Sequence, residues 1–249
     1  MKKLNLILPK LIGHRGVAGS APENTLASIQ KAAHLGISWV EFDVKLTCDH
    51  ELVLIHDSYL NRTTNGNGPV AEHSLETLKK LDAGSWFGPE FIGETIPTLS
   101  QALNTAKKLG LNCNIELKPE TGQERPIARK VSLIVSNFLR PPNVLVSSFC
   151  YETLCMVKNY MPTVPRALNI QKIPGNWQHL VEQAGCISLH IDQKALNSKQ
   201  IETLRSNGIE VLAFTVNERQ RAESLFAMGV SGIFTDTPEQ FFSINQDFL

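Results

Sequence analysis

Short apolar runs alternate with amphipathic stretches along most of the chain. The apolar runs predict eight strands, at residues 11–14, 39–46, 111–118, 144–149, 166–170, 186–191, 210–216 and 232–235. The amphipathic stretches predict helices at residues 24–35, 99–109, 124–138, 151–161, 176–183, 198–206 and 218–228, and a last helix after Pro238. Strands that alternate with helices pair in parallel. Eight such units in 249 residues match the size of one (β/α)8 barrel, the TIM barrel of α/β proteins.

One long connection interrupts this alternation, after the second strand. Residues 52–56 alternate like a further strand, and residues 62–68 are rich in the Thr, Asn and Gly of turns. We therefore expect a single domain over residues 1–249, with a small insertion at about residues 57–96 between the second strand and the second helix. In a TIM barrel such a connection lies on the catalytic face, where lids that select the substrate are built.

The balance of charge restricts the kinds of partner that the chain can have. It contains 24 basic and 24 acidic residues, so its net charge gives no reason to expect nucleic acid or a stable membrane association. An anionic small-molecule substrate would have to be held by a local site. The sequence leaves open whether the protein is a monomer or a homodimer, because the surface through which a barrel pairs has no sequence signature.

The start of the chain and the cysteines bear on its location. Residues 4–8 are apolar like a signal peptide, but Pro9 and Lys10 interrupt them, and we expect a strand or barrel-closing segment there. The five cysteines form no CxxC pair, which is typical of reduced thiols. No apolar stretch approaches the ~20 residues that a membrane span needs. A cytoplasmic protein is the expectation.

Acidic residues occupy alternate positions in two neighbouring strands. Glu41 and Asp43 share one face of the second strand, with Cα atoms ~7 Å apart. If their side chains approach to about 5 Å, they repel by roughly 3 kcal/mol at an effective dielectric of about 20. The third strand would bring Glu116 beside them, with Lys118 on the same face. Such oxygen ligands suit one divalent cation, Mg²⁺ or Ca²⁺. The alternative is a set of solvated acids with an ordinary Glu116–Lys118 ion pair.

Two histidines lie at or near strand ends, each next to a charged residue. His14 precedes Arg15, and His56 precedes Asp57. An imidazole titrates near neutral pH, so two of them in one pocket could serve as acid and base in the cleavage of a phosphodiester. The planar guanidinium of Arg15 could bind phosphate oxygens. A lone histidine at a strand end is also often structural, and the residues alone leave both interpretations open.

Other residues have weaker claims on the site. Phe149 and Phe214 could line an apolar wall, or be ordinary core aromatics, and His190 on the sixth strand could touch substrate, as could Asp192. Asn24 is interpreted as the cap of the first helix. Glu23 could brace the site, and His34, His50, His73 and His179 are expected to be structural or at the surface.

Taken together, an ordered set of motifs resembles the glycerophosphodiester phosphodiesterase family. The motifs are His14-Arg15-Gly16, Ala21-Pro22-Glu23-Asn24-Thr25, Glu41-Phe42-Asp43-Val44, His56-Asp57, Arg62-Thr63-Thr64, Glu116-Leu117-Lys118, Ser147-Ser148-Phe149, Phe214-Thr215-Val216-Asn217 and Gly232-Ile233-Phe234-Thr235-Asp236. They span almost the whole chain in the expected order. The run Asp82-Ala83-Gly84-Ser85-Trp86 and the run Thr215-Val216-Asn217 look like the cytosolic bacterial branch, which is associated with glycerol phosphate uptake.

The resemblance implies a function and a set of roles. The substrates would be glycerophosphodiesters, the deacylated phospholipids, and the products sn-glycerol 3-phosphate and an alcohol, formed through a cyclic phosphate. The implied site residues are the metal ligands Glu41, Asp43 and Glu116, the acid–base pair His14 and His56, and the phosphate-binding Arg15 and Lys118. His56 is the preferred first base and His14 the acid. Phe214 departs from the larger or more polar aromatic of many relatives, which leaves the fine specificity open.

Two alternatives remain, a second kind of enzyme and a protein of another class. A phospholipase C- or D-like barrel that acts on intact lipid would need an apolar or basic rim, which the neutral composition does not favour. A catalytically inactive phosphate-binding barrel would be expected to lack at least one catalytic position, but all of the positions above are present.

Overall fold

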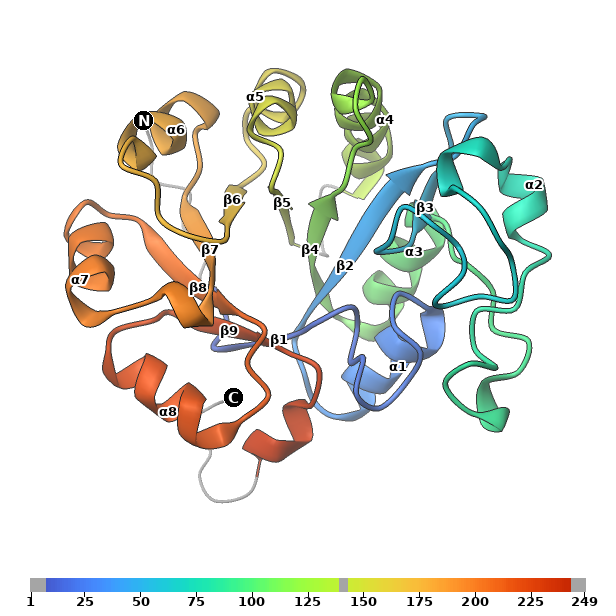
Figure 1. Ribbon diagram of the computed structural model, residues 1–249, viewed down its shortest axis with the longest axis horizontal. Coiled ribbons are helices and arrows are strands. Elements are labelled where there is room, and N and C mark those ends of the chain that lie inside the picture. The colour runs from blue at the N-terminus through green and yellow to red at the C-terminus, as the bar shows by residue number, and fades with distance from the viewer. Residues whose placement is uncertain (1–7, 139–142, 243–249) are drawn as a thin grey trace.

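The computed structural model describes residues 8–138 and 143–242, which form a closed parallel barrel surrounded by helices (Figure 1). The strands are β1 (Leu11–Gly13), β2 (Trp39–Leu46), β3 (Leu52–Leu54), β4 (Asn112–Leu117), β5 (Val144–Ser148), β6 (Arg166–Ile170), β7 (Ser188–Asp192), β8 (Glu210–Phe214) and β9 (Gly232–Thr235). β1 pairs in parallel with both β2 and β9, which closes the barrel, and β3 pairs antiparallel with β2. The predicted TIM barrel is confirmed. Residues 4–7 of the predicted closing segment lie outside the described residues.

Helices follow the barrel strands as the alternation predicted. They are α1 (Leu26–His34), α3 (Leu99–Leu109), α4 (Glu124–Val135), α5 (Tyr151–Tyr160), α6 (Trp177–Ala184), α7 (Ser198–Ser206) and α8 (Arg219–Ala227). The short helix α2 (Leu75–Leu78), in the long connection after β3, was not predicted. Gly110 and Gly185 end α3 and α6 in the left-handed conformation, with φ of 70° and 65°. The helix predicted after Pro238 is, within the described residues, a single 3₁₀ turn, Pro238–Phe241.

The barrel interior is apolar at one end and polar at the other. Ile12, Trp39, Leu145, Ala167, Leu212 and Phe234 form a buried cluster between the strands. Because successive side chains alternate between the faces of a strand, the residues two positions further on also point inward. Polar residues occupy most of these positions, namely His14, Glu41, Ser147, Asn169 and Asp236. The alternation therefore places polar chemistry at the carboxyl ends of the strands, the catalytic face of a TIM barrel.

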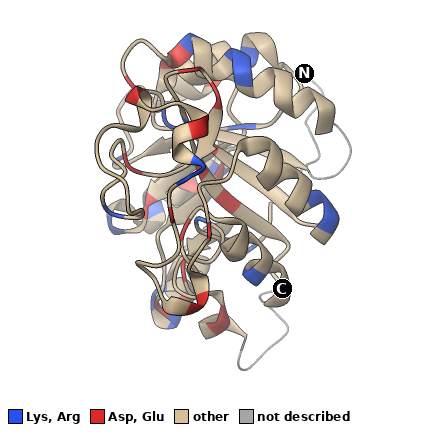
Figure 2. Ribbon diagram, turned by 90° about the vertical axis from the view of Figure 1, so that its right-hand side faces the viewer, with Lys and Arg blue, Asp and Glu red and all other residues tan. Residues whose placement is uncertain are grey.

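The segment between β3 and α3 folds over one side of the barrel and contains α2 and two 3₁₀ turns (Val70–Glu72 and Pro89–Phe91). It has a small core of its own, made of Val53, Ile55, Leu60, Val70, Leu78, Ala83 and Ile96. The strand expected at residues 52–56 is shorter, because the antiparallel pairing with β2 ends at Leu54. Figure 2 looks onto this side and shows basic and acidic residues interspersed over the described ribbon.

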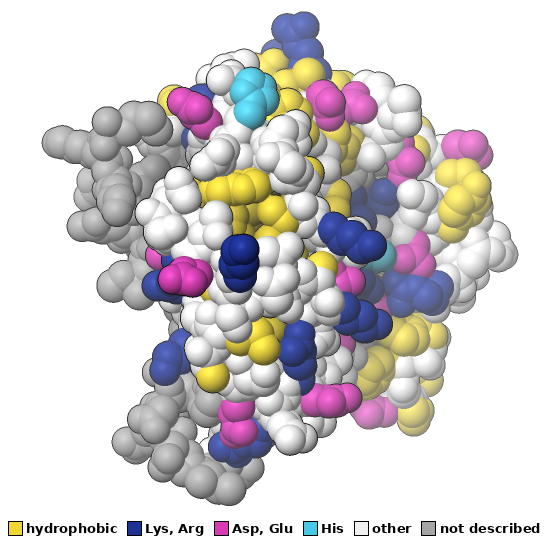
Figure 3. Space-filling model, turned by 60° about the vertical axis from the view of Figure 1, so that its left-hand side comes forward, with side chains coloured by type: hydrophobic (Ala, Val, Ile, Leu, Met, Phe, Trp, Pro, Cys, Tyr) yellow, Lys and Arg dark blue, Asp and Glu magenta, His cyan; other side chains and the backbone are white. Residues whose placement is uncertain are grey.

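The exposed hydrophobic residues are scattered over the surface. The large ones are Tyr59, Trp86, Ile92, Leu109, Leu133, Phe149 and Tyr160. In the view of Figure 3, hydrophobic side chains form small separate groups among polar and charged ones. Within the described ranges, none of the helices has both the length and the apolar character of a membrane span.

Candidate active site

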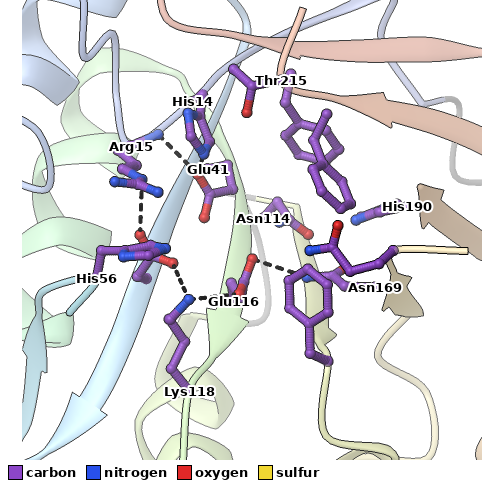
Figure 4. Close-up of a pocket in the computed structure, with 15 residues that line it drawn as sticks. His14, Arg15, Glu41, His56, Asn114, Glu116, Lys118, Asn169, His190 and Thr215 are labelled. Atoms are coloured by element: carbon purple, nitrogen blue, oxygen red, sulfur yellow. Dashed lines mark hydrogen bonds and ion pairs between the residues drawn. The ribbon is translucent and has the colours of Figure 1, made fainter. Parts of the chain in front are cut away.

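A cavity of about 360 Å³ opens at the carboxyl ends of the barrel strands (Figure 4). Ten residues that the sequence suggested line it, namely His14, Arg15, Glu41, Asp43, His56, Glu116, Lys118, Phe149, His190 and Phe214. Five further residues complete the lining, Asn114, Asn169, Gln171, Thr215 and Phe234. Asp192, which the sequence also suggested, instead accepts a hydrogen bond from the Lys194 amide over 2.9 Å at the start of a 3₁₀ turn.

Three carboxylates meet inside this cavity. The parallel register of β2 and β4 places Asp43 opposite Glu116, and one oxygen each from Glu41, Asp43 and Glu116 lies within 4.8 Å of the others. Burial and the neighbouring carboxylates raise the pKa of Glu41 well above its usual range, and burial together with Asp43 raises the pKa of Glu116. The Oε1 atom of Glu41 is buried without a hydrogen-bond partner. These acceptor oxygens therefore fit a hard divalent cation, whose charge would offset their repulsion.

Asn24 holds one of these carboxylates, which corrects the expectation that it only caps a helix. Its Nδ2 donates to Asp43 Oδ2 over 2.9 Å, and its Oδ1 accepts from the Asp43 amide over 3.0 Å. The N-cap of α1 is Thr25, whose hydroxyl accepts from the Ser28 amide. The helix begins later than predicted because Asn24 has a left-handed φ of 58°. Its side chain is thereby free to bind Asp43 on the neighbouring strand.

The other two carboxylates are also held by hydrogen bonds. The Arg15 amide donates to Glu41 Oε2 over 2.8 Å, from a residue with a left-handed φ of 51°. Asn169 Nδ2 donates to Glu116 Oε2 over 2.9 Å from β6. Asn169 was not among the residues predicted for the site, although a polar amide within a buried strand needs a hydrogen-bond partner there. Each carboxylate of the cluster thus has a fixed orientation.

His14 is oriented by a residue from the other end of the chain. Its Nδ1 lies 2.7 Å from Asp236 Oδ1, and its Nε2 lies 3.9 Å from Glu41 Oε2. Asn217 Nδ2 donates to Asp236 Oδ2 over 2.7 Å, and the Asp236 amide donates to Asn217 Oδ1 over 2.8 Å. Asp236 ends the motif Gly232-Ile233-Phe234-Thr235-Asp236, but its role could not be predicted from the sequence, because its partner lies 222 residues away.

His56 has a carboxylate at the corresponding atom. Its Nδ1 lies 2.7 Å from Asp57 Oδ1, so the pairing noted in the sequence is a direct contact. Burial lowers the pKa of His56, and this effect outweighs the opposing charge of Asp43. The imidazole is therefore neutral near pH 7. With a proton on Nδ1 shared with Asp57, its Nε2 is left with a lone pair.

Arg15 and Lys118 place positive charge beside the carboxylates. Arg15 Nη1 donates to Glu23 Oε1 over 2.7 Å, and its Nε lies 3.5 Å from Asp43 Oδ2. Lys118 Nζ lies 3.3 Å from Glu116 Oε1 and 3.5 Å from Asp43 Oδ1. Although burial alone would lower the pKa of Lys118, Asp43 and Glu116 raise it above its ordinary value. Both cations are held where they face the same cavity.

Comparison with known proteins decides the family. The model of the glycerophosphoryl diester phosphodiesterase family matches residues 14–240. The chain belongs to this family. A glycerophosphodiester phosphodiesterase of Caldanaerobacter subterraneus is 35% identical, over 94% of this chain and 96% of its own. One from Bacillus subtilis is 32% identical, over 99% of this chain and 90% of its own. The resemblance inferred from the motifs is confirmed, as is the assignment to an enzyme class.

A solved structure gives a close match to the fold. The phosphodiesterase of Oleispira antarctica, in complex with the product sn-glycerol-3-phosphate, is 40% identical to this family member and superposes with a TM-score of 0.93. The match covers 95% of this chain and 96% of that one.

In the protein described here, the aromatic residues of the site divide between the mouth of the cavity and its floor. Phe149 and Phe214 meet edge to face with ring centroids 5.7 Å apart, and Phe149 is 44% exposed. Phe149 is therefore no ordinary core residue. His190 is buried against Phe234, with centroids 4.8 Å apart, and burial lowers its pKa to about 3. His190 is thus a neutral member of the lining.

Proposed function

We propose that the protein hydrolyses glycerophosphodiesters to sn-glycerol 3-phosphate and an alcohol, in a reaction that depends on one divalent cation, Mg²⁺ or Ca²⁺. One observation carries the proposal: the lining of a single cavity includes three carboxylates, two cations and two histidines, His14 and His56, that each have a carboxylate at Nδ1. The product complex of the Oleispira relative supports a glycerol phosphate as the bound portion. The cavity has the size of a site for a small molecule.

Binding is the first role of the charged residues. Glu41, Asp43 and Glu116 would hold the cation, which supplies positive charge that polarises a phosphoryl group. Arg15 and Lys118 would bind the phosphate oxygens, the first as a planar fork and the second as a point charge. The carboxylates beside both cations keep them charged, so the phosphate meets two fixed positive groups.

Acid–base chemistry is the role proposed for the histidines. His56, neutral and with Nε2 unprotonated, takes the proton of the glycerol 2-hydroxyl, whose oxygen attacks phosphorus. His14 gives a proton to the departing alcohol, and a cyclic phosphate remains. In the second half of the reaction His14 takes a proton from water, the water oxygen attacks phosphorus, and His56 returns its proton to the 2-oxygen. Both histidines then regain their starting states.

Apolar contacts would orient the carbon atoms of the substrate. Phe149 and Phe214 form one wall at the mouth of the cavity, suited to the glycerol or head-group carbons. His190 would contribute a neutral ring to the floor beside Phe234. The wall is small and flanked by charge, which favours a deacylated substrate over an intact lipid.

The test measures release of sn-glycerol 3-phosphate by purified, chelator-treated protein. The substrates are glycerophosphocholine, glycerophosphoethanolamine and glycerophosphoglycerol, each with Mg²⁺, Ca²⁺ or neither. We expect release from more than one substrate, only with metal, and its loss in His14→Ala and His56→Ala proteins that still bind the ion. If no sn-glycerol 3-phosphate is released with any ion, the proposal is overturned. Release of a head group from intact phospholipid would favour the lipid-acting alternative.

We also propose a reducing compartment, the cytoplasm, as the place of action. All five cysteines are free, and Cys113 and Cys186 are buried. Titration of thiols in protein from freshly lysed cells should find all five reduced. A disulfide in that protein would contradict the location.

A further inference from the structure

Arg62, in the segment between β3 and α3, lies outside the cavity lining but binds two carboxylates at once. Its Nε and Nη2 donate to the two oxygens of Asp57, over 2.6 and 3.0 Å. Its Nη1 and Nη2 donate to the two oxygens of Glu23, over 2.7 and 2.8 Å. Paired bonds from the two sides of a guanidinium fix both position and orientation, which single bonds do not. Arg62 thus holds both carboxylates rigidly.

The same two carboxylates hold residues of the proposed reaction. Asp57 Oδ1 contacts His56 Nδ1 at 2.7 Å, and Glu23 Oε1 accepts from Arg15 Nη1 over 2.7 Å. A continuous chain of charged contacts therefore runs from His56 through Asp57, Arg62 and Glu23 to Arg15. It joins the loop after β1 to the segment after β3.

Burial and charge give this chain more weight than an isolated surface pair. The Glu23 side chain is 9% exposed, that of Asp57 31% and that of Arg62 44%. Although burial would raise the pKa of Glu23, the bonds from Arg62 and the charge of Arg15 lower it. Hydrogen bonds from Arg62 lower the pKa of Asp57 strongly. An exposed pair is worth little, but a network with bidentate geometry restricts motion.

The inserted segment fixes the backbone on either side of Arg62. Leu60 is buried in the core of the segment, and its amide donates to Gly68 O over 3.0 Å. Thr63 is also buried, at 6% exposure. The guanidinium therefore extends from an anchored loop toward the barrel. The loop fixes its backbone, and the two carboxylates fix its end.

We infer that Arg62 is a positioning residue: it locks Asp57 and Glu23 in the orientations that aim His56 at the substrate hydroxyl and Arg15 at the phosphate. The inference rests on the proposed function and gives the insertion a part in building the active site. Lysine cannot replace Arg62, because one ammonium group cannot supply two bidentate pairs.

The first experiment compares kcat and KM of the wild type with those of Arg62→Ala and Arg62→Lys. We expect kcat/KM to fall about 100-fold in the alanine variant, the size of effect that a 1 Å misplacement produces, and nearly as far in the lysine variant. Millimolar methylguanidinium should restore part of the activity of Arg62→Ala only. Arg205→Ala is the matched control. Arg205 is 45% exposed and pairs with Glu210, the first residue of β8, at the end of the barrel away from the cavity. The kinetics of Arg205→Ala should equal those of the wild type.

The second experiment divides the effect between the two branches. Asp57→Asn should lower kcat, because it frees His56, and Glu23→Gln should raise KM, because it frees Arg15. Arg62→Ala should change both parameters. When Arg62→Ala is combined with Asp57→Asn or Glu23→Gln, the fall in kcat/KM should be smaller than the product of the two separate falls, because these residues act through one another.

A third measurement needs no turnover. Nitrogen NMR of His56 should report one tautomer in the wild type and an average of tautomers in Arg62→Ala, with melting temperature as the check on folding. If the wild type shows no activity but gives these spectra, the proposed function is rejected, while the positioning role of Arg62 is retained. The positioning role of Arg62 would be overturned by three results together. The wild type would be active, Arg62→Ala and Arg62→Lys would have kcat/KM within threefold of the wild-type value, and the His56 spectrum would be unchanged in Arg62→Ala.

Discussion

Asn24 and Asp43 hold each other through two hydrogen bonds, amide to carboxylate and backbone amide to side-chain oxygen, of 2.9 and 3.0 Å. Both residues are almost fully buried, at 3% and 2% exposure. The other oxygen, Asp43 Oδ1, lies 3.5 Å from Lys118 Nζ, and one oxygen of Asp43 lies within 4.8 Å of an oxygen of Glu41 and of Glu116. The orientation of a proposed metal ligand is therefore set by a residue of the β1–α1 loop.

Asn24→Ala should weaken binding of the cation. Loss of a residue that orients a ligand costs about 10- to 100-fold in metal affinity, and activity should need correspondingly more Mg²⁺. Calorimetric titration of chelator-treated protein gives the affinity. Thr25→Ala is the control: it removes the N-cap of α1 and about 1 kcal/mol of stability, but should leave the affinity unchanged. Equal affinities for Asn24→Ala and wild type would refute the role of Asn24.

Asp236→Asn should lower kcat with little change in KM. Asp236 fixes the Nδ1 of His14 through Oδ1 and accepts from Asn217 Nδ2 through Oδ2. An amide at this position would have to turn its NH2 group either against the Asn217 donor or toward His14 Nδ1, where it favours the other tautomer. A loss of about 100-fold is expected, the lower range for a misdirected acid–base group. Steady-state kinetics measure it, with Glu239→Ala, which loses only an exposed hydrogen bond from the Ser20 hydroxyl, as the neighbouring control. Activity within threefold of wild type would show that Asp236 does not orient His14.

Glu41→Gln should separate metal affinity from stability. Removal of one of three clustered carboxylates weakens the cation site but relieves their repulsion. The chelator-treated variant should therefore melt at a higher temperature than chelator-treated wild type, and gain less from added Mg²⁺. Activity lost at low ion concentration should partly return at high concentration. An activity curve that added metal never shifts would remove Glu41 from the ligand set.

His190 should make the protein less stable in acid. Burial lowers the folded pKa of His190 to about 3, whereas the unfolded value is near 6.5. Between these values the unfolded chain binds the extra proton, so stability is full above pH 6.5 and is lost as pH falls toward 3, by about 1.4 kcal/mol per unit. His190→Asn should show a shallower acid slope in denaturant melts at several pH values. His34, which is exposed, supplies the control substitution His34→Gln. Parallel curves for wild type and His190→Asn would contradict the expectation.

Short-range patterns predicted most of the fold and the cluster of carboxylates. β2, β6 and β9 have the predicted bounds, because alternation and apolar runs are local signals. The same alternation placed Glu41 and Asp43 on one face, and the neighbouring strand brought Glu116 beside them. The alternation could not show whether Asn24 caps the first helix or binds a carboxylate, since both roles use the same residue types.

The residues alone determined which side chains share a face, because the two-residue period of a strand is a property of the local chain. Barrel closure decided the rest. The parallel register of β1 with β9, Gly13 opposite Thr235, brings Asp236 to His14 across 222 positions. Arg62 reaches Glu23, 39 positions earlier in the chain, only because the insertion folds back over the barrel. Such partners depend on distances across the folded chain, and no spacing along the sequence encodes them.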